Sequence, residues 1–169
     1  FAPDDSGNSI GAALETSVKN KIKLDRKNFS SFLGLESSEQ HIKKQLDLYK
    51  INYFKPKNLI SFIVNLLIKD NVIGLFRDKS EFGQRALGNR SIIASPVNKS
   101  IKNKINKLIK FRENFRPFAP VIKFNNLKEI FDTTDTDQVN YMEKVFKFRK
   151  KYYSICPGVI HEDFTGRVQ

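Results

Sequence analysis

The side chains best suited to bind an anion lie in residues 81–91, a glycine-containing segment with two arginines, an amide and a hydroxyl. Arg85 and Arg90 can each donate two parallel N–H bonds to a phosphate or carboxylate. Asn89 and Ser91 add neutral hydrogen-bonding groups, and the glycines allow close approach of the backbone to a ligand. A tight turn with two solvated arginines is the alternative, and this segment alone does not decide between them.

A second candidate segment, residues 110–120, alternates basic and aromatic side chains and ends in two prolines that hold the backbone extended. Lys110, Arg112 and Arg116 could bind phosphate, and interleaved aromatic rings could stack on bases. A structural role is also open for Lys110 and Arg112, because cations are favoured at the end of a helix. We expect the three phenylalanines of this segment to be core residues rather than stacking surfaces.

The third candidate segment is the final one, residues 161–169, which contains a histidine, a hydroxyl and an arginine. His161 could act as a general acid or bind an anion, although a lone histidine after a strand is more often structural. Thr165 and Arg167 would border the same site. The sequence has no Cys/His cluster, no Walker loop and no G-x-G-x-x-G, which argues against a self-contained zinc or dinucleotide site.

The positive charge is concentrated around these segments. The chain has 169 residues and a formal net charge of +12, and between residues 77 and 123 there are twelve Lys and Arg but only three Asp and Glu. Such a concentration attracts phosphate, nucleotide or nucleic acid. An apolar content of 40% is too high for a disordered polyelectrolyte and allows one core.

Other features indicate a cytoplasmic protein. Cys156 is the only cysteine, so it is expected to be a small buried hydrophobe in a reducing compartment. No apolar run of membrane-spanning length and no basic signal-peptide start are present. Because the chain opens on Phe1 and its only methionine is Met142, we expect a processed protein or a piece of a longer one.

The elements expected to position these residues alternate between helix and strand. A polar turn leads into a small-residue helix over residues 4–14, and residues 20–37 are expected to be a linker. Ser38 should cap a helix with Ile42, Leu46 and Tyr49 on one face. The remaining expected helices cover residues 56–70, with Pro56 in the first turn, 99–111, with Ile101, Ile105, Leu108 and Ile109 on one face, and 127–131. The expected strands cover residues 72–76, 91–94, 120–124, 145–148 and 158–161. This order predicts an α/β or α+β fold with a mixed sheet.

Together the three segments resemble the C-terminal part of the O-carbamoyltransferases of the nodulation and antibiotic-tailoring (NodU/CmcH) type. The matching strings are EFGQRALGNRSIIASP at 81–96, KFRENFRPFAP at 110–120 and HEDFTGRVQ at 161–169. The family pattern reads approximately EFGPRALGNRSI, then N-x-x-x-KFRExFRPFAP, then HxDGTARVQTV, and Asn106 matches the asparagine ahead of the second string. Residues 3–14 are similar to the family's P-x-x-GDxGxxLGAAL, so the resemblance covers nearly the whole chain.

The resemblance implies a two-domain enzyme. Residues 1–20 would be the remnant of an N-terminal actin-like ATPase-fold domain, residues 21–50 a linker and connecting helix, and residues 51–169 a YrdC-like domain with a twisted mixed sheet and flanking helices. The YrdC-like domain would join carbamoyl phosphate and ATP, with Mg²⁺, into carbamoyl-adenylate. The actin-like domain would then transfer the carbamoyl group to a hydroxyl of a small acceptor.

The same resemblance suggests roles for the candidate residues. Arg85, Arg90, Lys110, Arg112 and His161 would form the catalytic clamp on phosphate and carbamoyl groups. The substrate-binding residues would be Asn89, Ser91, Arg116, Thr165 and Arg167. Asp5 matches an acidic residue that helps to hold a divalent metal, iron among the candidates, together with histidines of the upstream domain.

Three departures from the family pattern could alter activity or acceptor choice. Asp78 and Phe164 stand where the family has glycine, and Gln84 stands where it has proline. Two alternatives therefore stay open. One is an inactive, degenerate domain, and the other is a basic RNA-binding module of the YrdC type used in tRNA modification, although the specific strings favour the enzyme and nucleic acid is not the expected partner. We expect no membrane partner.

Overall fold

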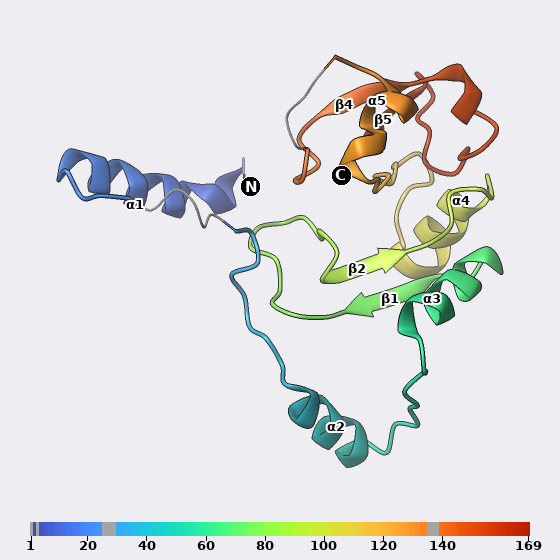
Figure 1. The fold of residues 1–169 in the computed structure, drawn as a ribbon, viewed down its shortest axis with the longest axis horizontal. Helices are drawn as coiled ribbons and strands as arrows, with labels where there is room; N and C mark the ends of the chain where they lie inside the picture. Colours follow the sequence, from blue (N-terminus) through green and yellow to red (C-terminus); the bar gives the residue numbers. More distant parts are fainter. Residues whose placement is uncertain (1, 3, 25–29, 135–138) are drawn as a thin grey trace.

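A computed structural model describes residues 2, 4–24, 30–134 and 139–169 (Figure 1). Its α-helices are α1 (Asn8–Lys19), α2 (Glu39–Leu48), α3 (Leu59–Ile68), α4 (Ile101–Ile105) and α5 (Leu127–Ile130). Its other helices are the 3-10 helices η1 (Asp5–Gly7), η3 (Phe124–Asn126) and η4 (Lys150–Tyr152) and the π-helix η2 (Asn106–Lys110). Its strands are β1 (Ile73–Phe76), β2 (Arg90–Ile93), β3 (Phe131–Asp132), β4 (Val145–Phe148) and β5 (Thr165–Arg167).

The strands form two separate antiparallel sheets. The first pairs β1 with β2, with Ile73 opposite Ile93 and Phe76 opposite Arg90. The second has the order β3-β4-β5, with Phe131 opposite Phe148. Helices and strands are mixed along the chain, so the α+β class is confirmed. The structure differs from the expectation in its pairing, which is antiparallel within two small sheets instead of mixed within one.

The buried core lies on the second sheet. Leu127, Phe131, Val139, Phe148 and Val168 form one cluster, and Phe131 and Val168 are completely buried. The rings of Phe131 and Phe148 pack with centroids 4.3 Å apart. This cluster anchors α5 and the end of β5, and β5 belongs to the third candidate segment. The core therefore fixes the strand on which Thr165 and Arg167 stand.

The N-terminal half is less densely packed. Figure 1 shows α1 extending to one side of the sheets and α2 standing at the end of a long connection, and neither helix contains a buried residue. Ser38 caps α2 as predicted, its Oγ accepting from the His41 N–H at 3.1 Å. Asn58, not Pro56, begins the next helix, because its side chain caps α3 while Pro56 lies outside the first turn. In the described part of the chain, no helix is long and apolar enough to cross a membrane.

The helix predicted over residues 99–111 is divided into α4 and the π-helix η2. A π-helix places more than four residues in each turn, so the apolar stripe does not stay on one face. Ile101 and Ile105 are buried as expected, whereas Leu108 is 61% exposed and Ile109 is 39% exposed. Asn106 takes the buried position instead, with no exposed surface at all.

Two predicted strands are absent from the described structure. Residues 120–123 form neither helix nor strand, and Phe124 begins η3. This segment exchanges two backbone hydrogen bonds with Gln169: the Ile122 N–H donates to the Gln169 carbonyl, and the Gln169 N–H donates to the Pro120 carbonyl. Residues 158–161 form turns, and the strand lies further along, at β5. The apolar residues of both segments have strand-like composition, but the strand that pairs with β4 is Thr165–Arg167. The remaining predicted helices and strands are present, with shifts at their ends.

Candidate functional site

The loop before β2 is organised by the carboxylate of Glu81. Its Oε1 accepts three backbone N–H bonds, from Leu87 at 2.7 Å, Asn89 at 2.7 Å and Arg90 at 3.1 Å. Burial alone would raise the pKa of Glu81, but the N–H groups of Asn89 and Leu87 outweigh burial and lower it. Glu81 is therefore ionised at neutral pH and holds the backbone that presents Arg85.

The predicted ligands Asn89 and Ser91 also hold this loop. Asn89 is buried and its Nδ2 donates to the Lys79 carbonyl at 2.7 Å. The Oγ of Ser91 accepts from the Gly88 N–H at 2.9 Å. Gly88 has a φ of +115°, which a residue with a side chain rarely adopts. These contacts indicate positioning roles, and binding of substrate by Asn89 and Ser91 stays a prediction.

Arg90 is directed at the protein backbone. Its guanidinium donates to the carbonyls of Arg77 at 2.5 Å, Asn89 at 2.9 Å, Asp78 at 3.1 Å and Leu35 at 3.3 Å. It also lies over the Phe76 ring, 3.6 Å from the centroid. Because both terminal nitrogens are occupied, the described contacts give Arg90 a structural role. Arg85, by contrast, is exposed on the loop.

The second segment is held by Asn106. Its Nδ2 donates to the Arg116 carbonyl at 2.9 Å and its Oδ1 accepts from Arg112 Nε at 2.7 Å. The Arg112 guanidinium also lies 4.9 Å from the centroid of the Phe118 ring. Arg112 is thereby fixed, whereas Arg116 is exposed and paired with Glu113 at 2.7 Å. Lys110 lies exposed at the end of η2.

The aromatic residues of this segment correct a prediction. Phe111 is 83% exposed and Phe115 is 74% exposed, so neither is a core residue. Phe111 has a φ of +48°, which ends η2 in a left-handed residue and turns its ring outward. Lys107, Phe111 and Arg112 line a shallow hollow of about 560 Å³. Only Phe118 is partly buried, where it lines an apolar pocket.

The C-terminal segment forms a chain of polar contacts. Thr165 Oγ1 donates to Asp163 Oδ1 at 2.7 Å and lies 3.0 Å from His161 Nδ1. Burial lowers the pKa of His161, Asp163 opposes this shift, and Arg167 and Lys102 add to it. The imidazole lines two hollows of about 870 and 340 Å³, and Lys102 lines both with it.

Arg167 connects the three candidate segments. Burial lowers its pKa, and the positive charges of Arg85 and Arg112 lower it further, so both guanidinium groups lie within electrostatic reach of Arg167. The Nε of Arg167 and the Nε2 of His161 are enclosed and have no hydrogen-bond partner among the described residues. Like charges repel, so a gathering of arginines with an unsatisfied donor favours an anion as the missing partner.

The structure thus brings together Arg85, Arg112, His161, Thr165 and Arg167, while it directs Arg90 to the backbone. Sequence reasoning missed Glu81 as a functional residue. The available signal was a carboxylate placed just before a run of loop N–H groups, where an oxygen can accept several bonds. No group of three His, Cys, Asp or Glu in the described residues could hold a metal.

The departures at Asp78 and Phe164 fall on left-handed backbone. Their φ angles are +42° and +64°, which explains why glycine suits both positions. The Phe164 ring stacks on Tyr153, with centroids 4.6 Å apart and planes 15° apart, and this contact offsets part of the strain. Gln84, the third departure, hydrogen-bonds Asp4, whose pKa is lowered chiefly by Ser6 and also by Gln84 and Arg85.

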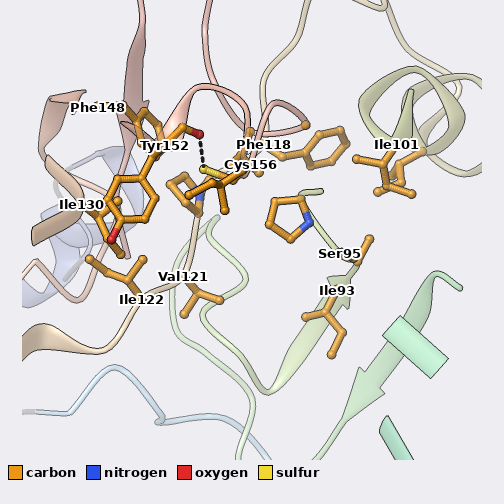
Figure 2. Close-up of a pocket in the computed structure, with 18 of the residues that line it drawn as sticks. Ile93, Ser95, Ile101, Phe118, Val121, Ile122, Ile130, Phe148, Tyr152 and Cys156 are labelled. Carbon is orange, nitrogen blue, oxygen red and sulfur yellow. Dashed lines mark hydrogen bonds between the residues drawn. The ribbon is translucent and has the colours of Figure 1, made fainter. Parts of the chain in front are cut away.

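An apolar pocket of about 310 Å³ lies between the two sheets (Figure 2). Ile93 and Ile101 line one side, and Val121, Tyr152 and Cys156 the other. Cys156 Sγ lies 3.3 Å from the Tyr152 carbonyl, and burial raises the pKa of this thiol. Cys156 is therefore uncharged at neutral pH and is half-buried, close to the small hydrophobe expected.

Comparisons with known proteins show the family to which this chain belongs. The model of the family described as "Carbamoyltransferase C-terminus" matches residues 64–169, more than half of the chain, so the protein belongs to this family.

Similar proteins occur in archaea and bacteria. An uncharacterized protein of Methanocaldococcus jannaschii is 36% identical over 98% of this chain. Nodulation protein NolO of Bradyrhizobium diazoefficiens is 32% identical and nodulation protein U of Azorhizobium caulinodans 34% identical, each over 99% of this chain. The chain spans about a third of the length of the first two relatives, 32% of each.

Proposed function

We propose that this chain is part of an ATP-dependent carbamoyltransferase and that it binds carbamoyl phosphate and ATP, with Mg²⁺, to form carbamoyl-adenylate. The observation that carries the proposal is the enclosed, unpartnered Nε of Arg167 beside Arg85 and Arg112. The positive charges of Arg85 and Arg112 both act on Arg167 and disfavour its charged form. A phosphate among them would relieve the repulsion and supply the missing acceptor.

The chain's own residues would act by holding and neutralising charge. Arg112, fixed by Asn106, belongs to the cationic cluster and also lines the hollow beside Phe111. An adenine ring could stack on the exposed Phe111 while its phosphates reach Arg112. Phosphoryl and acyl-phosphate chemistry depends mainly on such positioning and charge stabilisation.

Isothermal titration of the chain with carbamoyl phosphate tests the proposal. Arg85→Ala should weaken binding by about 10- to 150-fold, since one charged hydrogen bond contributes roughly 1.5–3 kcal/mol. Arg149→Ala is the matched control, because Arg149 is exposed and bonds the Lys128 carbonyl, outside the cluster. Failure of the folded chain to bind carbamoyl phosphate, or equal weakening by both variants, would refute the proposal.

Completion of the reaction needs parts that the family's longer members carry. We propose that transfer of the carbamoyl group to a hydroxyl of a small acceptor takes place on an actin-like domain of the whole protein, in the cytoplasm. A role for Asp5 in binding a divalent metal such as iron requires ligands from outside this chain. Asp5 itself opens the 3-10 helix η1. Carbamoyl-adenylate keeps the carbamoyl group and AMP only, so addition of ATP and carbamoyl phosphate to the chain should consume one water and release both inorganic phosphate and pyrophosphate, without modifying an acceptor.

A second candidate function, binding of single-stranded nucleic acid, is favoured by one observation. Phe111 and Phe115 are largely exposed beside lysines and arginines, the pairing that stacks and neutralises an RNA strand. RNA affinity should then fall steeply as salt is raised, because counterions are released on binding. Phe115→Ala should weaken RNA binding. A shallow salt dependence would exclude this function.

A further inference from the structure

The contacts of Thr165 fix which nitrogen of His161 carries a proton. Asp163 has a lowered pKa, chiefly through its bonds from Thr165, so its carboxylate is ionised at neutral pH and can only accept. The single hydroxyl proton of Thr165 is therefore donated to Asp163 Oδ1, 2.7 Å away. At its 3.0 Å contact with His161, Thr165 must accept, and Nδ1 must carry the N–H.

This assignment makes Nε2 of His161 a lone-pair acceptor. Burial, helped by the charges of Arg167 and Lys102, outweighs the opposing charge of Asp163 and lowers the pKa of His161, so the ring is neutral at neutral pH and has one proton only. Nε2 is enclosed and has no hydrogen-bond partner in the part of the chain that the structure describes, and the same holds for the N–H of Arg167 Nε. Buried acceptors and donors are nearly always paired in folded proteins. The site therefore lacks a donor for His161 Nε2 and an acceptor for Arg167 Nε–H. The charge of Arg167 also acts on the pKa of His161, so the two side chains lie within electrostatic reach.

We propose that His161 Nε2 and Arg167 Nε recognise the carbamoyl group itself, the first accepting from its –NH2 and the second donating to its carbonyl oxygen. Asp163 and Thr165 are positioning residues that hold His161 in the required tautomer. The inference rests on the proposed function. It assigns His161 the part of a neutral acceptor, whereas the sequence suggested a general acid or an anion ligand.

The proposal predicts a specific discrimination. Acetyl phosphate has the shape of carbamoyl phosphate but carries a methyl group in place of the –NH2. A methyl group leaves Nε2 unpaired and displaces any water from it, so the chain should bind acetyl phosphate about 5- to 150-fold more weakly. Inorganic phosphate lacks the carbonyl and amide and should also bind more weakly.

The tautomer is tested first, without ligand. The chain has two histidines, so ¹⁵N NMR of the imidazole rings gives a simple spectrum, with the exposed His41 as internal reference. The expected result is protonation of His161 at Nδ1 only. Thr165→Ser keeps the hydroxyl and should keep this pattern, whereas Thr165→Val, which suits a strand, should shift proton occupancy toward Nε2. Protonation of His161 at Nε2 in the wild-type chain overturns the proposal.

Ligand discrimination is tested next by titrating the whole chain with carbamoyl phosphate and acetyl phosphate. The preference should be present in the wild type and in Thr165→Ser and reduced at least 5-fold in Thr165→Val. Equal affinity of the wild type for both compounds overturns this inference and leaves the proposed function standing. If carbamoyl phosphate does not bind at all, the proposed function fails, and the inference fails with it. The wild-type spectrum and the wild-type affinity ratio decide the matter even if a variant does not fold.

Discussion

The carboxylate of Glu81 should contribute a measurable share of the stability of the loop that carries Arg85. Glu81→Gln keeps an oxygen near the three N–H groups, at 2.7, 2.7 and 3.1 Å in the wild type, but removes its charge. Bonds to charged groups are about twice as strong as neutral ones, so each loses about 1 kcal/mol. One oxygen serves all three and the site is only half-buried, so we expect a total loss of about 2 kcal/mol.

Two measurements check this value. The denaturation midpoint of Glu81→Gln should fall, and amide hydrogen exchange should accelerate at Leu87, Asn89 and Arg90 in particular. Glu15→Gln, an exposed change on α1, is the control and should alter neither. Unchanged exchange at the three amides would refute the reasoning, because the N–H groups would then be protected by something other than the carboxylate.

The sign of the pH dependence is also fixed. The pKa of Glu81 is lowered in the folded protein, so its stabilising effect is complete above the ordinary glutamate pKa of about 4.3 and is lost as pH falls through the folded value. Wild-type protection of the three amides should therefore disappear in acid. In Glu81→Gln the same protection should be weaker at neutral pH and should not change over this range.

Three further outcomes are expected. Asn106→Ala should destabilise the chain by about 2–3 kcal/mol in chemical denaturation, because it leaves the Arg112 side chain and the Arg116 carbonyl without their buried partner; wild-type stability would contradict the role of Asn106. Asp78→Gly should stabilise the chain by up to about 1 kcal/mol in thermal denaturation, since the φ angle of Asp78 is +42°. A lowered midpoint would show that the ion pair between Asp78 and Arg77 contributes more to stability than the backbone strain costs. Tyr152→Phe should raise the pKa of Glu129 from about 2 toward its usual range, because the Tyr152 hydroxyl donates to that carboxylate at 2.6 Å; an NMR titration that finds no change would reject this cause.

Local sequence patterns predicted the helices and strands that are marked by a capping residue or an apolar run. Ser38 begins α2 as expected from its capping hydroxyl, and the apolar runs of β1 and β4 pair as strands. The predictions failed where long-range pairing decides the outcome. β5 has little strand-like composition, yet it pairs with β4, and the more apolar residues 158–161 do not form a strand. Composition cannot reveal which backbone a strand will meet.

The candidate site was predictable in its membership and not in its geometry. The sequence grouped Arg85, Arg112, His161 and Arg167 through motifs that are far apart along the chain, and the structure places Arg85 and Arg112 within electrostatic reach of Arg167, and Arg167 within reach of His161. It could not show that Arg90 binds four backbone carbonyls, because an arginine that holds a loop and one that binds phosphate look alike in sequence. The π-helix that buries Asn106 also has no local signal.

The hydrogen bond from Gln169 Nε2 to the Leu87 carbonyl, 2.9 Å long, joins residues 82 positions apart. Gln169 also exchanges backbone bonds with Pro120 and Ile122. On the ribosome, the glycine-containing loop is therefore synthesised long before the residues that fasten it to the second sheet. Such distant closures are slow to form. We expect anion-binding competence to be the last property that the chain acquires as it folds.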